Sequence, residues 1–343
     1  MGKRTVLLNG CSLSIRDVMD AGDGSVVFET DETALKAMSA SRSAVDRILD
    51  RDEVVYGINT GFGALSRVTI EHDQLEELQY NLIRSHACGV GERMQPEHVL
   101  MMMLIRANTL CTGHSGCRPD VVDLILGMIN AGIAPVIPRI GSLGASGDLA
   151  PLSHMALGMI GEGECNVLND GVWLSQSSTS ALEQAGLNPL ILQAKEGLSL
   201  INGTSQMCAY LAVCMTNMEH LVFAADVSAA CSVEAIFGSH APFDQRVHNA
   251  RPQRGQSISA ARISSLLRNS AINESHVNCN RVQDAYSFRC APQVHGPVID
   301  LLVETRRMLM IEINSATDNP LIFTDGINDD VISGGNFHGQ NLS

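Results

Sequence analysis

An apolar stretch over residues 207–237 constrains the fold more than any other part of the sequence. Asn, Glu, His and Asp residues interrupt it, so it lacks the roughly 20 mostly apolar residues of a membrane span and predicts a buried helix instead. A helix of about 30 residues runs roughly 45 Å, which is longer than a compact domain needs. The stretch therefore favours a bundle that packs against partner subunits, with a long helix inside a monomeric bundle as the alternative.

Other apolar segments, in which polar residues return at every third or fourth position, predict further helices. They cover residues 32–49, 98–111, 121–131, 149–161, 260–267 and 298–313, the last beginning near Pro297. Short strand-like segments occur at residues 5–8, 26–28, 54–55 and 165–168. The expected fold class is mainly α, a long-helix bundle with a mixed N-terminal region carrying short strands and active-site loops. We expect an N-terminal region over residues 1–200 and a central helical-bundle region over residues 201–343.

Charge and cysteine content exclude several classes of function. The 343 residues contain 23 Lys and Arg against 37 Asp and Glu, a net charge of −14 that argues against binding nucleic acid. Ten cysteines without a Cys-x-x-Cys pair suit a reducing compartment, so we expect a cytoplasmic protein. We expect it to bind neither nucleic acid nor a membrane. Cys111, His114 and Cys117 could supply three metal ligands, but the glycines between them indicate a turn and no fourth ligand is evident. We therefore expect no metal.

A glycine-rich loop, GSLGASGDLAPL, occupies residues 141–152. On its Gly, Ser and Asp content alone, the loop is a turn in which Ser146 or Asp148 caps the next helix. The glycine spacing, without a following Lys-Ser or Lys-Thr pair, disfavours a phosphate-binding loop. A third interpretation is covalent. The Gly147 amide nitrogen, unobstructed by a side chain, attacks the Ala145 carbonyl, and loss of water from Ser146 leaves an electrophilic methylidene.

The run GSLGASGDLAPLSH at residues 141–154 resembles the signature of the aromatic amino acid ammonia-lyases. That family builds a 4-methylidene-imidazol-5-one (MIO) prosthetic group from its own Ala-Ser-Gly. Other segments resemble family motifs in family order, namely YGINTGFG at 56–63, NGT at 202–204, QDAYSFRC at 283–290 and GGNFH at 334–338. The resemblance covers nearly the whole chain. It implies an MIO formed from Ala145, Ser146 and Gly147, with no metal or nucleotide cofactor.

The resemblance also implies roles for three residues that would touch the substrate. Tyr56 matches the tyrosine that removes the β-proton of the substrate. Arg289 matches the arginine that binds the substrate carboxylate, a planar anion suited to a bidentate guanidinium. Asn202 matches an amide that orients the substrate. Taken alone, Tyr56 more often indicates an aromatic ring packed on a glycine loop, and Arg289 a solvated or paired helix charge. The alternative for Asn202 is a helix cap.

Three further residues match positions around the prosthetic group. Gln283 and Tyr286 match residues beside the MIO, and the resemblance gives Tyr286 a part in MIO assembly and proton handling. Phe337 matches an aromatic ring packed over the electrophile, whereas on its own it would indicate simple core burial. Position 285 is Ala where many relatives have Pro, a difference that alters loop stiffness more than chemistry.

The expected substrate depends on the segment Ser85-His86-Ala87. Histidine-specific family members resemble Ser-His here, tyrosine-specific members His-Leu, and phenylalanine-specific members an apolar pair. The imidazole of His86 can hydrogen-bond to a substrate imidazole, which an apolar side chain cannot. We therefore expect deamination of L-histidine to urocanate and ammonia in a homotetramer with shared active sites. The alternatives are a tyrosine or phenylalanine ammonia-lyase or aminomutase, and a catalytically silent truncated subunit.

Family members continue past the position that matches Ser343 into a further helical region, so we expect the chain to be C-terminally incomplete. That region supplies an acidic residue that contacts the substrate ring in histidine-specific members. The pair Gly339-Gln340, which follows the GGNFH segment, favours aromatic lyases or aminomutases slightly. Glu312 and Asp318, near a helix end, are expected to face solvent.

Overall fold

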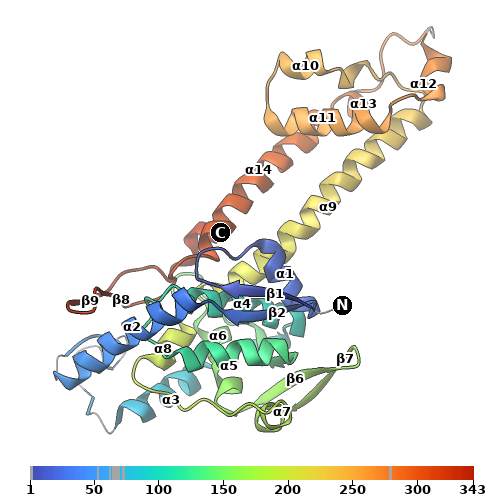
Figure 1. The fold of residues 1–343 in the computed structure, drawn as a ribbon. Helices are drawn as coiled ribbons and strands as arrows, with labels where there is room; N and C mark the ends of the chain where they lie inside the picture. The colour runs from blue at the N-terminus through green and yellow to red at the C-terminus, as the bar shows by residue number, and fades with distance from the viewer. Residues whose placement is uncertain (1–2, 52–53, 62, 64–69, 72–73, 278–279) are drawn as a thin grey trace. The chain divides into compact units, whose positions relative to one another are not determined.

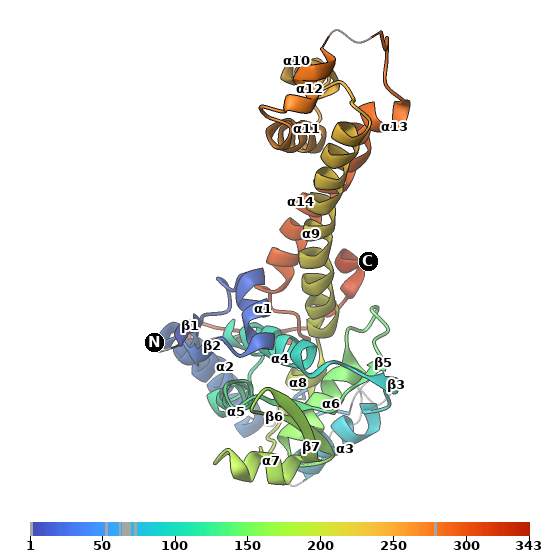
Figure 2. The same cartoon turned by 90° about the vertical axis from the view of Figure 1, so that its right-hand side faces the viewer.

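A computed structural model of the protein describes residues 3–51, 54–61, 63, 70–71, 74–277 and 280–343. The chain divides into two compact units, Met1–Ala212 with Leu309–Ser343, and Val213–Met308. Figure 1 and Figure 2 show the helices and short strands of each unit. The mainly α class is confirmed. These units differ from the two regions expected over 1–200 and 201–343, because the end of the chain returns to the first unit.

The first unit is built around apolar helices. In α4 every residue from Val99 to Cys111 is buried, so this helix is enclosed on all sides. The expected helices at 32–49, 98–111, 121–131 and 149–161 are confirmed as α2, α4, α5 and α6. The helices of this unit are α1 (Ile15–Asp23), α2 (Glu32–Asp50), α3 (Leu75–His86), α4 (Pro96–Cys111), α5 (Pro119–Asn130), α6 (Leu149–Met159), α7 (Ser178–Gln184), α8 (Glu196–Ile201) and the 3-10 helix η4 (Gly339–Leu342).

Short strands in the first unit pair into four small sheets within the described residues. Strands β1 (Arg4–Leu8) and β2 (Val26–Thr30) are parallel. The other three sheets are antiparallel and consist of β3 (Val90–Arg93) with β5 (Pro138–Ile140), β4 (Ile133–Pro135) with β6 (Glu164–Asn169) and β7 (Val172–Ser177), and β8 (Leu321–Thr324) with β9 (Asp329–Ile332). The expected strand at 54–55 is wrong. The Val55 carbonyl accepts from the N–H groups of Ile58 and Asn59, so the backbone turns there.

The second unit has a small core between helices. Two of its helices, α9 (Ser205–Ala235) and α14 (Ala291–Glu312), have their other ends in the first unit. Between them lie η3 (Ala241–Phe243), α10 (Gln245–Asn249), α11 (Arg254–Leu266), α12 (Ala271–His276) and α13 (Tyr286–Arg289). The core comprises Ala230, Val233, Phe243, Ile263, Leu267 and Ala291.

Helix α14 begins at Ala291, so the expected start near Pro297 is wrong and the proline lies inside the helix. Helices α11 and α14 approach closely where each has a glycine. A Cβ atom on Gly255 would lie only 2.0 Å from the carbonyl oxygen of Gly296.

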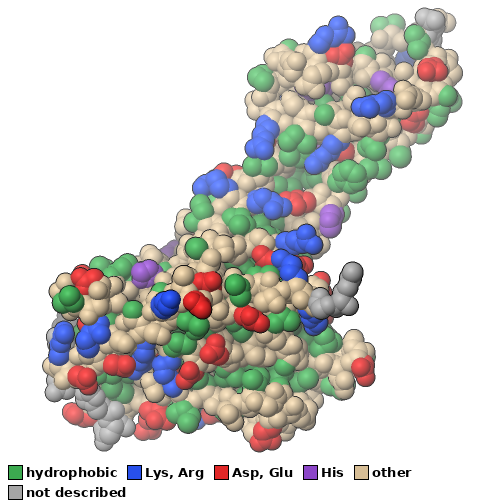
Figure 3. Space-filling model, viewed as in Figure 1, with side chains coloured by type: hydrophobic (Ala, Val, Ile, Leu, Met, Phe, Trp, Pro, Cys, Tyr) green, Lys and Arg blue, Asp and Glu red, His purple; other side chains and the backbone are tan. Residues whose placement is uncertain are grey.

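Helix α9 is buried on one side only in the second unit. The side chains of Leu221 and Phe223 are 60% and 51% exposed, and Figure 3 shows hydrophobic side chains on the surface of this unit. The expectation of a buried helix over 207–237 is therefore wrong for its later part, because the small core covers a single face. The stretch Glu196–Ala235 is long and apolar enough to cross a membrane, but core helices of soluble proteins meet the same criterion, so this is weak support for a span.

Candidate active site

Five residues singled out in the sequence surround one cavity of about 250 Å³ in the first unit. They come from five separate segments of the chain, so the fold and not sequence proximity brings them together. These residues are Tyr56, His86, Ser146, Asn202 and Phe337. The rest of the wall is mainly apolar and consists of Gly63, Leu82, Leu149, Leu198, Ile201 and Asn319. Within the expected loop 56–63, Phe62 lies outside the described residues.

Gly147 is the most tightly enclosed residue of the Ala145-Ser146-Gly147 segment. Its φ is +73°, and a Cβ atom there would lie 2.4 Å from the carbonyl oxygen of Gly203 and 2.9 Å from that of Phe337. Only glycine fits such a position. Cyclisation to an MIO needs a tight turn and an amide nitrogen without a neighbouring side chain. The residues present therefore fit this prosthetic group.

Asp148 ties the loop to the start of α9. Its backbone N–H donates to the Gly203 carbonyl (2.7 Å), and its Oδ2 accepts from the N–H groups of Gln206 (2.7 Å) and Met207 (3.1 Å). Asp148 precedes α6 but makes no side-chain cap hydrogen bond there, so the simple capping interpretation is wrong. The carboxylate instead satisfies the open amides of α9, which would otherwise be buried without partners.

The environment of Asp148 predicts a pH dependence of stability. Burial raises its pKa to about 6, although hydrogen bonds and the charge of Arg106 oppose the shift. The folded protein therefore holds a proton that the unfolded chain releases between about pH 4 and pH 6. The contribution of Asp148 to the free energy of unfolding should fall by about 3 kcal/mol as the pH rises through this window. Denaturant unfolding from pH 4 to pH 7 measures the change.

The variant Asp148→Asn isolates this contribution because it cannot titrate. The difference in unfolding free energy between the wild type and the variant should shrink as the pH rises and level off above about pH 6.5. Parallel stability curves for the two proteins would show that Asp148 has an ordinary pKa in the folded state.

His86 ends α3 with a defined tautomer. Its Nδ1 lies 2.9 Å from the Leu82 carbonyl oxygen, which can only accept, so Nδ1 carries the proton and Nε2 is the acceptor in the neutral ring. The segment that follows is anchored as well, because Gly89 N–H donates to Nε2 of His154 (3.1 Å). His86 thus lines the cavity with its Nδ1–H already engaged.

Asn202 is held by a buried ion pair that the sequence did not indicate. Its amide nitrogen donates to Asp318 Oδ1 (3.2 Å) and to the Asn319 carbonyl oxygen (3.0 Å). Asp318 also pairs with Lys195 (Nζ–Oδ2 3.0 Å), and both of these side chains are fully buried. The expectation that Asp318 faces solvent is wrong, because Lys195 compensates its charge inside the unit.

Two further buried groups near the site were also missed. The guanidinium of Arg106 donates to the backbone carbonyls of Ser199, Asn202 and Thr317, and so joins α4 to the end of α8 and to the segment at Thr317. Glu312 is partly buried and accepts from the Thr204 hydroxyl (2.6 Å), so the expectation that it faces solvent is wrong too. Burial raises the pKa of Glu312. A mixed charge pattern at a helix end carries no signal for such long-range partners.

The remaining predicted site residues, Gln283, Tyr286 and Arg289, belong to the second unit and do not line this cavity. The Tyr286 side chain is 73% exposed. Arg289 Nε donates to the Asp284 carbonyl oxygen (3.0 Å). With its amide oxygen turned toward the guanidinium, Gln283 accepts from Nη1 (2.7 Å) and Nη2 (3.2 Å) of Arg289. These contacts hold the guanidinium in one orientation.

Cys111, His114 and Cys117 make structural contacts and do not form a metal site in the described residues. Burial raises the pKa of both thiols to about 12, which disfavours the thiolate form that binds metals. The Nδ1 atom of His114 hydrogen-bonds to the Ile322 carbonyl oxygen (3.0 Å). Across the described residues, no three His, Cys, Asp or Glu side chains gather to hold a metal ion.

A family model described as aromatic amino acid lyase matches residues 13–343, so the chain belongs to the aromatic amino acid lyase family. It is 45% identical, over its full length, to a histidine ammonia-lyase from Myxococcus xanthus, of which it covers 66%. It is 46% identical to a histidine ammonia-lyase from Paracidovorax citrulli, with 98% of this chain and 64% of the relative covered. The chain thus spans about two thirds of the length of these curated relatives.

Solved structures of the family have the same fold. Histidine ammonia-lyase from Trypanosoma cruzi matches with a TM-score of 0.88 at 41% identity, covering 98% of this chain and 62% of that one. Tyrosine aminomutase from Streptomyces globisporus matches with a TM-score of 0.88 at 35% identity, covering 98% and 66%. The fold is therefore shared by lyases and aminomutases, and the identity of the cavity residues has to distinguish them.

Proposed function

We propose that the protein is an ammonia-lyase that converts L-histidine to urocanate and ammonia. The observation that carries the proposal is the single cavity that gathers Ser146, Tyr56 and His86 from distant segments. The similarity to histidine ammonia-lyases at 45% identity supports the same substrate. The tautomer of His86 also supports it, since its Nε2 atom is set to accept a hydrogen bond from a substrate N–H.

The prosthetic group would form from the chain itself. The amide nitrogen of Gly147 attacks the carbonyl carbon of Ala145, and the new ring loses one water. Ser146 then loses its hydroxyl and α-hydrogen as a second water, which leaves the methylidene. The close contacts of Gly147 with two backbone carbonyls support this proposal, because they hold the segment in a tight turn. When present, the MIO supplies an electrophilic carbon that makes the substrate amine a better leaving group.

The other cavity residues would bind the substrate and move its proton. His86 accepts the imidazole N–H of the substrate at Nε2. The Asn202 amide nitrogen is already engaged, so its oxygen is the group that accepts a hydrogen bond from the substrate amine. Tyr56 removes the β-proton as the base, and ammonia departs. Phe337 packs beside the reacting carbon and excludes water.

The carboxylate would be bound by a residue from another copy of the chain. The cavity wall in the described residues contains no Lys or Arg, whereas Arg289 is held ready in the second unit. We therefore propose a homotetramer with shared active sites, in which Gln283, Tyr286 and Arg289 of one subunit complete the cavity of another. The free cysteines of the described residues support a cytoplasmic location. The exposed apolar side chains of α9, including Leu221 and Phe223, support such an assembly because water-exposed apolar area favours association.

The test is to incubate the full-length protein separately with L-histidine, L-tyrosine and L-phenylalanine and to follow the products by absorbance and mass spectrometry. The proposal expects urocanate and ammonia from histidine. Coumarate or cinnamate without urocanate would instead identify a lyase for the other aromatic amino acids, and β-amino acids would identify an aminomutase. Gel filtration of the same sample tests the tetramer.

Replacing His86 with Leu should weaken histidine recognition selectively. The variant leaves the ring N–H of the bound substrate without an acceptor in an apolar wall, which costs about 1–3 kcal/mol. We expect kcat/KM for histidine to fall about 10-fold to 100-fold. Steady-state kinetics measures this change, and Asn81→Leu is the matched control because Asn81 is exposed on the same helix and does not line the cavity. Equal losses in both variants would argue against recognition by the imidazole.

A further inference from the structure

The segment that carries Gln283 and Arg289 is fixed to the C-terminal end of α9 by a second set of polar contacts. The carboxylate of Asp284 accepts from the backbone N–H of Ser239 at Oδ2 (2.6 Å) and from Nη1 of Arg281 at Oδ1 (3.1 Å). Its side chain is only 5% exposed. We name these three residues, Ser239, Arg281 and Asp284, the loop anchor. All of its members lie in the second unit.

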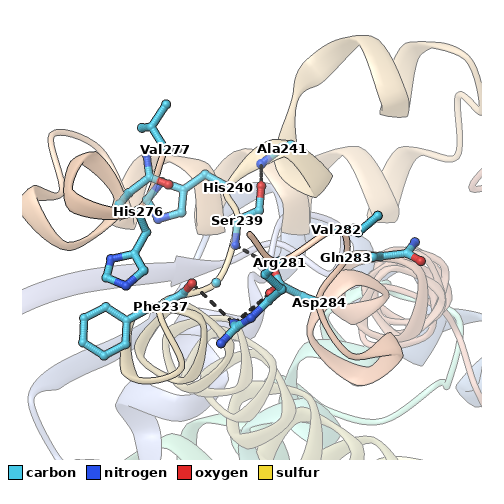
Figure 4. A pocket seen from close by; sticks show the side chains of 12 residues that line it. Phe237, Ser239, His240, Ala241, His276, Val277, Arg281, Val282, Gln283 and Asp284 are labelled. Carbon is cyan, nitrogen blue, oxygen red and sulfur yellow. Dashed lines mark hydrogen bonds and ion pairs between the residues drawn. The ribbon is translucent and has the colours of Figure 1, made fainter. Parts of the chain in front are cut away.

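Arg281 joins the loop anchor to the end of the helix itself. Its Nη1 also donates to the carbonyl oxygens of Ile236 (2.9 Å) and Phe237 (3.5 Å), just beyond the last residue of α9. Carbonyl groups at a helix C-terminus lack partners within the helix and carry partial negative charge, so a guanidinium stabilises them. Figure 4 shows the Arg281 side chain between Phe237 and Asp284, beside a cavity of about 330 Å³.

The loop anchor fixes the backbone at the point where Arg289 is held. The Asp284 side chain restrains its own peptide unit, and the carbonyl oxygen of this residue accepts from Arg289 Nε (3.0 Å). Gln283, the preceding residue, accepts from both terminal nitrogens of the same guanidinium. These contacts engage Nε and both terminal nitrogens, so they fix the plane of the guanidinium, and one N–H on each terminal nitrogen remains on opposite flanks for a ligand oxygen.

We propose that Asp284 is a positioning residue for carboxylate recognition, and that it acts by holding the segment 283–289 so that Arg289 is oriented before the substrate binds. The proposal rests on the proposed function, in which Arg289 binds the substrate carboxylate. A guanidinium fixed in advance loses less conformational entropy on binding than a free one. The loop anchor therefore contributes to affinity without touching the substrate.

Kinetics of the full-length protein tests this role. In Asp284→Ala we expect KM for L-histidine to rise about 10-fold to 100-fold while kcat changes much less, because orientation and not the proton transfer is lost. L-Histidinol, which has the same ring and amine but no carboxylate, serves as a competitive inhibitor. Its inhibition constant should change less than about 2-fold, because a ligand without a carboxylate does not use Arg289.

Two further variants separate positioning from a general loss of structure. Asp284→Asn keeps an acceptor for the Ser239 N–H and should recover part of the affinity for histidine. Asp244→Ala removes another Asp–Arg pair of the second unit, the pair of Asp244 with Arg246, and should leave KM unchanged. If Asp284→Ala weakens histidine and histidinol equally, or if Asp244→Ala has the same effect, the proposal is overturned.

A measurement that does not depend on activity keeps this proposal distinct from the proposed function. Hydrogen exchange of the backbone amides over Tyr286–Arg289 should be faster in Asp284→Ala than in the wild type, and unchanged in Asp244→Ala. If the wild type forms no urocanate but the exchange difference is present, the proposed function fails and the loop anchor stands as the support of Arg289. Unchanged exchange in Asp284→Ala would overturn the loop anchor whatever the substrate is.

Discussion

Replacing Ser146 with Ala is expected to abolish both the loss of two waters from the mass of the protein and the turnover of histidine. Alanine has no hydroxyl to eliminate, so no methylidene can form even if the ring closes. Without the electrophile the substrate amine remains a poor leaving group, and we expect kcat to fall by about 10³-fold or more. Intact-mass spectrometry and urocanate absorbance measure the two effects on the same sample.

The matched control is Ser142→Ala, in the same loop but outside the wall of the cavity. This variant should keep the mass of the cyclised protein. An unmodified mass in the wild type, obtained from a correctly assembled sample, would contradict the MIO proposal. So would full turnover by Ser146→Ala.

The second large effect concerns stability. Replacing Asp318 with Ala should lower the free energy of unfolding by about 3–5 kcal/mol, because it leaves the fully buried ammonium of Lys195 without its partner. The variant also removes an acceptor from the Asn202 amide, so the Asn202 side chain should no longer be held in a fixed orientation at the cavity. Denaturant unfolding monitored by circular dichroism measures the change.

Two controls show whether the buried charge is the cause. Glu92→Ala removes the partner of Arg139 from a pair in which both side chains are exposed, and should cost less than about 1 kcal/mol. The double variant Lys195→Met with Asp318→Leu removes both charges and should recover most of the lost stability. A cost for Asp318→Ala no larger than that for Glu92→Ala would contradict the assigned importance of the ion pair.

The parts of the fold that could be predicted from the sequence are those with strong local patterns. The apolar helix α4 is an example, since its residues are buried on every side and the pattern needs no knowledge of neighbours. Helix α3, which carries His86, was missed although its buried residues recur at helical spacing, at positions 75, 79, 82 and 83, so a local signal was present. The start of α14 was misplaced because proline is common in the first turn of a helix, whereas α14 begins at Ala291 and continues through Pro297.

Some residues of the candidate site could likewise be predicted from the sequence, whereas others could not. Tyr56, Ser146 and Phe337 were identified from motifs, and the structure places all three at one cavity. The burial of Asp318 could not be predicted, because it depends on Lys195, which lies far away in the sequence. A charged residue near a helix end gives the same local signal whether it meets solvent or a buried cation.

The enclosure of Gly147 has a consequence for how the protein matures. The two carbonyl oxygens that confine this glycine come from Gly203 and Phe337, both of which leave the ribosome later than the loop itself. A nascent chain therefore contains the Ala-Ser-Gly segment before the residues that enclose it have been synthesised. In the proposed enzyme, the ring would close only after folding is complete. A misfolded copy would therefore lack the MIO and would not deaminate the substrate.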